Sequence, residues 1–213
     1  AYRTTLVVAH GKGSEGEPRL ITNAYFDPIC ERPIGLDSVS AAALQARVFL
    51  DGRGLGESDC AAVVAKNRAF GAANPMAHRR QAVTVADALN SQHIAPPLRE
   101  SDICPVSDGA AAVILASADA ARGRARRPVW IQGVGYCADA PMGQRDLSQA
   151  PALRAAAKTA FRMAGIEDAR GIDAAEVSEQ FSYQELLWRH ELGLSDPDRV
   201  NRSGGCLSAH AWT

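Results

Sequence analysis

The sequence predicts a layered α/β fold, in which helices cover strands. Short apolar runs of strand length alternate along the chain with longer segments of helical periodicity, and no repeat of fixed short period is present. The runs of strand length cover residues 6–9, 110–116, 129–136 and 173–177. The helical segments cover residues 40–52, 58–73, 83–89, 153–164 and 181–192.

Capping residues support the ends of these helices. Ser40, Ser58 and Thr84 stand where a side-chain oxygen can accept a hydrogen bond from the first turn of a helix. Gly165 and Gly193 follow two other helical segments, at the position where glycine commonly ends a helix. The run at 110–116 is small and apolar, which is typical of a strand buried on both faces.

Composition excludes several classes of protein. Hydrophobic residues make up 46% of the 213 residues, so an ordinary core can form. The formal net charge of −1 argues against a nucleic-acid-binding protein, which usually carries a basic face. A short basic run lies between two apolar stretches, and it is either a solvated loop or a contact for a phosphate-bearing ligand. The run comprises Arg122, Arg124, Arg126 and Arg127.

Neither a membrane protein nor a disulfide-rich protein is indicated. No apolar run reaches the roughly 20 residues of a membrane helix, and the N-terminus lacks the order of a signal peptide. The five cysteines form no CxxC pair, so we expect neither a zinc site nor a disulfide framework. A reducing cytoplasm fits this pattern.

Both ends of the chain have the character of the interior of a fold. The chain opens on an apolar run at residues 6–9 and stops just after a glycine-rich turn. We therefore expect a piece of a longer or split protein.

Four stretches of the chain carry a family resemblance. They are ALQAR (43–47) with AKNR (65–68) and NP (74–75), CPVSDGAAA (104–112), EVSEQF (176–181) with ELL (185–187) and LGL (192–194), and NRSGG (201–205) with His210. In this order they resemble the thiolase superfamily, in particular its sterol-carrier-type and lipid-transfer-protein-like branch. The resemblance covers nearly the whole chain.

The resemblance implies a fold and its partners. Thiolases have a five-layered α-β-α-β-α fold made of two similar halves. Residues 1–125 would hold the end of the first half and the connecting segment, and residues 126–213 most of the second half, so the fold would be incomplete. The family implies coenzyme A as substrate with no tightly bound cofactor or metal, an acyl-CoA partner and a homodimer. Some lipid-transfer-like members also pair with a small zinc-ribbon and OB-fold subunit.

The family's chemistry defines the candidate site. A thiolase needs a cysteine thiolate to hold the acyl group, an acid or base for the α-carbon, and hydrogen-bond donors for the thioester oxygen. The family's nucleophile lies upstream of residue 6, and we expect that segment to be missing here. The resemblance makes His210 and Ser178 the catalytic candidates. It places Ser203, Gly204 and Gly205 at the coenzyme A thioester, although a plain tight turn is the alternative for these three.

Two departures put the standard reaction in doubt. Relatives have asparagine, histidine or tyrosine where Ser178 stands, and serine is a poor general base without help. The loop from Gly205 to His210 is one residue shorter than in ordinary thiolases, and Ala211 replaces the usual proline. A surface histidine therefore remains an alternative for His210.

The cysteines and one tyrosine have simpler interpretations. Four cysteines (Cys30, Cys60, Cys104 and Cys137) are expected to be buried apolar residues. Cys206 follows the glycine pair and either faces the active site or fills a tight loop. Tyr183 is expected to be a packing residue.

Three functions remain open from the sequence. The first is a thiolase-like acyltransferase, which makes or cleaves a carbon–carbon bond in a CoA thioester. The second is a retro-aldolase that acts on a β-hydroxyacyl-CoA. The third is a non-catalytic subunit that binds acyl-CoA.

Overall fold

The structure is a computed structural model that describes residues 2–124 and 126–209. Its strands are β1 (Thr4–Lys12), β2 (His93–Ala95), β3 (Leu98–Arg99) and β4 (Asp108–Ala116). Its α-helices are α1 (Pro18–Asn23), α2 (Ser38–Arg53), α3 (Glu57–Ala73), α4 (Val85–Asn90), α5 (Ala118–Arg124), α6 (Pro151–Ala164), α7 (Ser182–Leu192) and α8 (Gly205–Ser208). Short 3-10 turns lie at Gly13–Glu15, Glu100–Asp102, Met142–Gln144, Ala169–Gly171 and Pro197–Arg199.

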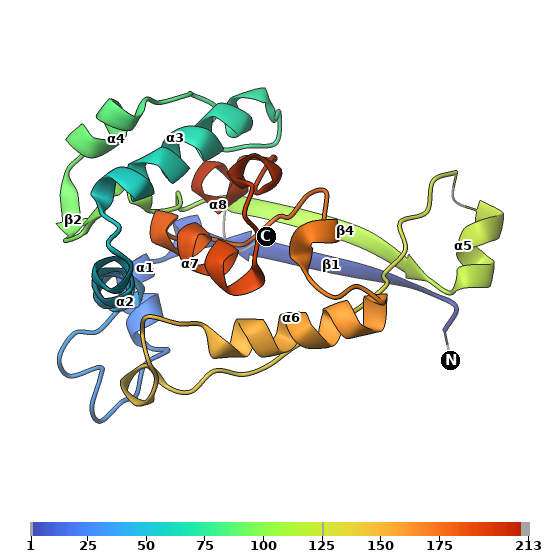
Figure 1. The fold of residues 1–213 in the computed structure, drawn as a ribbon, viewed down its shortest axis with the longest axis horizontal. Helices are drawn as coiled ribbons and strands as arrows, with labels where there is room; N and C mark the ends of the chain where they lie inside the picture. The colour runs from blue at the N-terminus through green and yellow to red at the C-terminus, as the bar shows by residue number, and fades with distance from the viewer. Residues whose placement is uncertain (1, 125, 210–213) are drawn as a thin grey trace.

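A long antiparallel ribbon and a group of helices make up the described part of the chain. β1 and β4 pair along their full length, from Thr4 with Ala116 to Lys12 with Asp108. Figure 1 shows this ribbon extending away from the helices, with α6 running alongside it and α7 lying between α6 and α3. β2 and β3 form a second small hairpin beside α3 and α4.

The helices form where the periodicity predicts them, and their caps refine the expected ends. The side chain of Asp37 caps α2 by accepting the N–H of Ser40 at 2.8 Å, while the Ser40 hydroxyl accepts the N–H of Asp37 at 2.9 Å. Ser40 is therefore the third residue of the helix and not its cap. The prediction for Ser58 is also wrong, because α3 begins after Gly56, whose N–H is bound by Asp59. Thr84 caps α4 as predicted.

The main core lies between α2 and α7. Phe49, Leu98, Phe181 and Leu187 belong to this apolar cluster and are almost completely buried. Leu207 of α8 belongs to a second cluster, which packs α8 and α4 against α3. Burial of these side chains removes apolar surface from water and so fixes α3, α7 and α8 relative to one another. These three elements carry the site described below.

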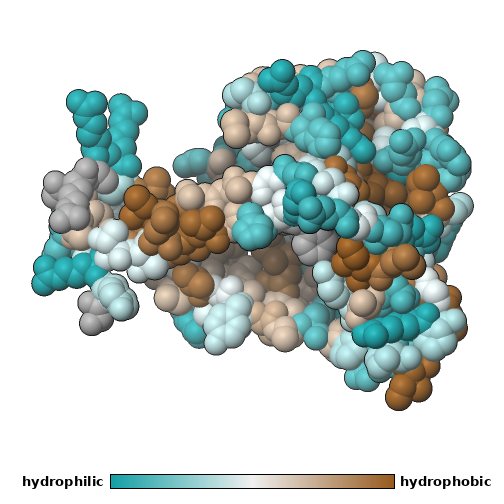
Figure 2. All heavy atoms as spheres, turned by 180° about the vertical axis from the view of Figure 1, so that it is seen from behind, coloured by the Kyte–Doolittle hydropathy of each residue, from teal (hydrophilic) through white to brown (hydrophobic). Residues whose placement is uncertain are grey.

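The ribbon differs from its expected environment. The prediction that residues 110–116 are buried on both faces is wrong, because Val113 and Ile114 of β4 are 55% and 70% exposed. Within the described part of the chain, β1 and β4 pair only with each other, and nearly every residue of both strands is exposed. Figure 2 shows apolar side chains gathered along the β1–β4 ribbon.

The predicted strand at residues 129–136 is also wrong. Among the described residues, this segment pairs with no strand, and its backbone packs on α6. A Cβ at Gly133 would lie 2.1 Å from the carbonyl oxygen of Ala160, and one at Gly135 would lie 1.9 Å from that of Ala156. The two glycines therefore allow residues 129–136 to pack closely against α6. The segment does not form a strand, because a strand needs a neighbouring strand with which to form hydrogen bonds.

Every helix among the described residues is too short or too polar to span a bilayer. The five cysteines are all free.

Candidate active site

Two of the predicted site segments meet beside α3. Residues 175 and 200 form a parallel bridge, in which the N–H of Ala175 donates to Arg199 O at 2.9 Å and the N–H of Asn201 donates to Ala175 O at 2.8 Å. This bridge is the whole of the strand expected at 173–177. It brings the segment that carries Ser178 alongside the turn formed by residues 201–205.

Ser203 is anchored in this turn by a carboxylate. Its N–H donates to Glu176 Oε1 at 2.9 Å, and its hydroxyl donates to Glu176 Oε2 at 2.6 Å. Both groups of Ser203 are exposed, so this anchor lies at the surface of the site. The contact between Ser203 and Glu176 therefore fixes the residue that precedes Gly204 and Gly205.

The glycine pair is required by the packing around it. Gly204 and Gly205 have φ values of +104° and +58°, which favour glycine. A Cβ at Gly204 would lie 2.6 Å from the Cα of Gly71 in α3, and one at Gly205 would lie 2.1 Å from Glu179 Oε1. The described structure thus explains both glycines by internal contacts. Their contact with coenzyme A remains a prediction.

Ser178 faces outward at the end of its segment, next to a cysteine. Ser178 is exposed, whereas its neighbour Glu179 is buried, as expected for adjacent residues in extended chain. The side chain of Ser178 lies close enough to Cys206 to lower the pKa of its thiol. Ser178 therefore lies at the glycine turn, as the resemblance implies.

The environment of Cys206 does not activate its thiol as a nucleophile. Burial raises the pKa of its thiol to about 12, and the nearby Glu179 and Cys104 add to the rise, while the side chain of Ser178 opposes it. The thiolate is the reactive form of cysteine, and little of it is present at neutral pH. The tight-loop interpretation of Cys206 is the one that this environment favours.

The remaining cysteines differ from one another. Burial raises the pKa of Cys60 to about 12, as expected for a structural cysteine. Cys104 is partly buried, but Cys30 and Cys137 are exposed, so the expectation that these two are buried is wrong. Both lie in irregular segments, where their apolar neighbours do not cover them.

Tyr183 is a packing residue, as expected. It is completely buried, and its hydroxyl donates to Gln45 Oε1 at 2.9 Å. Burial raises the pKa of the phenol above its ordinary value. His210, the other catalytic candidate, lies outside the described residues.

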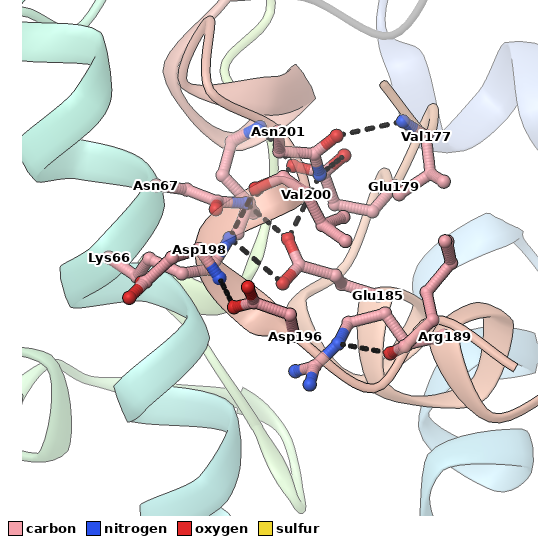
Figure 3. A network of polar contacts seen from close by, with 12 residues as sticks. Lys66, Asn67, Val177, Glu179, Glu185, Arg189, Asp196, Asp198, Val200 and Asn201 are labelled. Carbon is pink, nitrogen blue, oxygen red and sulfur yellow. Dashed lines mark hydrogen bonds and ion pairs between the residues drawn. The ribbon is translucent and has the colours of Figure 1, made fainter. Parts of the chain in front are cut away.

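A buried polar network lies directly beneath the glycine turn, and the sequence interpretation missed it (Figure 3). Glu179 and Glu185 are both fully buried and accept hydrogen bonds from the same two side-chain amides, those of Asn67 and Asn201, at 2.8–2.9 Å. Lys66 Nζ lies 3.0 Å from Glu185 Oε1. The stretch at residues 176–180 is polar, so the sequence offered no local signal for the burial of Glu179.

Burial strongly perturbs the pKa of Glu179. Burial raises the pKa of Glu179 to about 7, with a further rise from Glu185 and opposing hydrogen bonds from the backbone N–H groups of Leu207 and Cys206. Glu179 therefore changes its charge near neutral pH. Perturbed acids of this kind occur often at functional sites.

A second polar contact borders α8 on its other side. His78 Nδ1 contacts the hydroxyl of Ser107, and that hydroxyl also lies 3.3 Å from the carbonyl oxygen of Ala209. The N–H of Arg79 donates to Ser208 O at 2.8 Å. These contacts hold the end of α8 against the segment that follows α3.

A cleft of about 350 Å³ opens next to this region. It is bordered by the end of β1, by α1 and α2, and by the residues before β4 and α7. Apolar side chains, including Ile21, Val39 and Phe181, line it. Lys12 and Arg19 also border it, and they form ion pairs with Glu15 and Asp37. In the described part of the chain, no group of three or more His, Cys, Asp or Glu side chains could hold a metal ion.

The chain is similar to known proteins in both sequence and fold. No protein-family model matches the chain. The chain is 34% identical over 171 residues to an acetyl-CoA acetyltransferase of Methanothermobacter thermautotrophicus, covering 79% of this chain and 44% of the relative. It is 34% identical over 137 residues to the 17-hydroxy-3-oxo-4-pregnene-20-carboxyl-CoA lyase of Mycobacterium tuberculosis, covering 62% and 36%. The chain thus spans less than half the length of these relatives.

Solved structures agree with these matches. The Ltp2-ChsH2(DUF35) aldolase superposes with a TM-score of 0.82 at 22% identity, over 98% of this chain and 60% of that one. Human mitochondrial 3-ketoacyl-CoA thiolase superposes with a TM-score of 0.73 at 17% identity, over 99% and 61%. The α/β thiolase-like fold is therefore confirmed. The chain belongs to the thiolase superfamily, with similarity to its sterol-carrier and lipid-transfer-like branch.

Proposed function

We propose that the protein, in its full-length form, is a thiolase-like acyltransferase that makes or cleaves a carbon–carbon bond in a CoA thioester. The observation that carries this proposal is the 34% identity to an acetyl-CoA acetyltransferase over 79% of the chain. The convergence of Ser178 with the turn at Ser203, Gly204 and Gly205 supports it. Coenzyme A is then a substrate, and we expect no tightly bound cofactor.

The geometry suggests a role for Ser178, and the resemblance suggests one for His210. Ser178 is exposed beside the turn, so its hydroxyl can donate a hydrogen bond to the thioester oxygen as negative charge develops there. His210 would act as the acid or base at the α-carbon. In thiolysis, the bond between the α- and β-carbons breaks, the acyl group passes to the sulfur of free coenzyme A, and the α-carbon gains the proton that the thiol loses.

A retro-aldolase is the second candidate, and a specific observation favours it. The side chain at position 178 is a serine, and a relative of the chain is a carboxyl-CoA lyase. In a retro-aldol reaction the β-hydroxyl loses its proton, the bond between the α- and β-carbons breaks, and the α-carbon gains a proton. This route needs no cysteine nucleophile.

The expected assembly and location belong to the same proposal. We expect a homodimer, and we expect a small zinc-ribbon and OB-fold subunit as a partner. The name of a structurally similar aldolase contains a second component, ChsH2(DUF35), which supports this expectation. We also propose a cytoplasmic location and a division of the chain near residue 125.

Two substrates test the proposal with the full-length protein. A β-ketoacyl-CoA with free coenzyme A should yield a shortened acyl-CoA if the protein is a thiolase. A β-hydroxyacyl-CoA should yield a ketone or aldehyde if it is a retro-aldolase. Binding of acyl-CoA without either product would contradict both activities.

Two substitutions test the site. Ser178→Ala and His210→Ala should each lower kcat by about 100-fold or more, which is typical for loss of an oxyanion donor or a general acid–base group. Ser148→Ala is a matched control, because Ser148 forms hydrogen bonds with Asp146 in an exposed turn. Unchanged kcat in Ser178→Ala or His210→Ala would remove that residue from the site.

A further inference from the structure

The carboxylate of Glu179 joins three segments of the candidate site (Figure 3). It accepts hydrogen bonds from the side-chain amide of Asn67 in α3 at 2.9 Å and from that of Asn201 in the turn at 2.8 Å. It also accepts the backbone N–H of Leu207 in α8 at 3.3 Å. Glu179 itself directly follows Ser178, so one buried group connects the exposed serine with the turn beside it.

We propose that Glu179 is a positioning residue, whose carboxylate holds the turn of residues 201–207 against the segment that presents Ser178. This turn also carries Cys206, which lies beside the Ser178 side chain. The proposal rests on the proposed function for its effect on catalysis. The claim that Glu179 holds the turn in place depends only on contacts among the described residues.

The shape of the site supports this role. Glu179 Oε1 lies where a side chain at Gly205 would begin, since a Cβ there would be 2.1 Å from it. The same Cβ would be 2.8 Å from Asn201 Nδ2. The backbone of the turn therefore lies directly on the carboxylate, without an intervening side chain.

The chemistry of the contacts requires a carboxylate. All three partners are N–H donors, and the ionised carboxylate, which predominates above about pH 7, has only acceptor sites. A glutamine would direct its own NH₂ group at one of these donors. Glu179 therefore cannot be exchanged for its neutral isostere without the loss of a contact.

The neighbouring acid has a different role. Glu185 lies 3.0 Å from Lys66 Nζ, and Lys66 also donates to Val200 O at 2.8 Å. Among the described residues, no lysine or arginine forms an ion pair with Glu179. A buried acid without a cation lowers stability, so its presence is better explained by the geometry that it maintains.

Hydrogen exchange of the 213-residue chain tests the structural part. Glu179→Gln should raise the exchange rate of the amides in residues 201–208 by tenfold or more, relative to those of α2. Glu191→Gln is the matched control, because Glu191 is a buried acid at the far end of α7 that binds Arg154 and the N–H of Ala150. It should leave the exchange of residues 201–208 unchanged. Equal exchange of this turn in wild type and Glu179→Gln would overturn the proposal.

A second variant covers the case in which Glu179→Gln does not fold. Asn67→Ala removes one amide donor within a helix, where alanine is favourable. It should raise exchange in the same turn several-fold, and unchanged exchange would overturn the proposal.

Steady-state kinetics of the full-length protein test the catalytic part. Glu179→Gln should lower kcat by tenfold or more with KM within about threefold, whereas Glu191→Gln should change neither. A rise in KM alone would overturn a positioning role. If the wild type shows no turnover, the proposed function fails, and the exchange experiment alone decides the role of Glu179.

Discussion

The carboxylate of Glu179 occupies the space that a side chain at position 205 would need. A Cβ at Gly205 would lie 2.1 Å from Glu179 Oε1, and Gly205 has a φ of +58°. The two residues are far apart in sequence, but each restricts what the other position can accept.

Replacement of Gly205 by alanine should therefore destabilise the protein. The new Cβ would displace Glu179 and would hold alanine in a left-handed backbone conformation, at a cost of about 2–3 kcal/mol. Chemical denaturation measures the change. Gly52→Ala is the control, because nothing lies within 4 Å of its Cβ position near the end of α2, and it should be neutral or stabilising. Equal stability of Gly205→Ala and wild type would contradict this packing.

The stability of the protein should fall as pH rises from about 5 to about 7. Burial raises the pKa of Glu179 from its ordinary value of 4.5 to about 7, so the folded chain keeps a proton that the unfolded chain releases. Folding is then progressively opposed as pH rises between these two values. The denaturation midpoint, measured from pH 5 to pH 8, should show this slope.

Glu179→Gln should flatten the slope, because glutamine does not titrate. Glu191→Gln should keep it: despite burial, hydrogen bonds from Arg154 and Ala150 lower the pKa of Glu191, so this acid stays ionised throughout the window. A slope that persists unchanged in Glu179→Gln would assign the effect to another group.

The helices were predictable from the sequence because their signals are local. Periodicity identified α2, α3, α6 and α7, and Thr84, Gly165 and Gly193 cap their helices as predicted. The strand at 129–136 was not predictable in the same way. Its apolar residues have strand character, but pairing depends on a neighbour that no local pattern specifies.

The candidate site was predictable only in part, for the same physical reason. The structure places Ser178 beside the glycine turn, while the catalytic role of these residues stays a prediction. The role of Glu179 was missed because its donor Asn67 lies 112 residues away in the chain. A glutamate beside an exposed serine has no local feature that marks it as buried.

The cysteines should separate into two groups by their reaction with iodoacetamide at pH 7.5. Cys30 and Cys137 are exposed and should react fast. Cys60 and Cys206 are buried, and burial raises the pKa of both thiols to about 12, so they should react at least 100-fold more slowly. Peptide mass spectrometry resolves the four sites. Fast labelling of Cys206 in the folded protein would instead support it as a nucleophile.

Loss of the Tyr183 hydroxyl should lower stability without removing the fold. Tyr183→Phe deletes the hydrogen bond to Gln45 Oε1 and leaves that buried oxygen unpaired, at a cost of about 1–3 kcal/mol. Tyr136→Phe is the matched control, because Tyr136 is 94% exposed, and its change should stay within about 0.5 kcal/mol. Thermal unfolding of both variants measures the difference. If Tyr183→Phe is as stable as wild type but loses turnover, the hydroxyl acts in catalysis and not in packing.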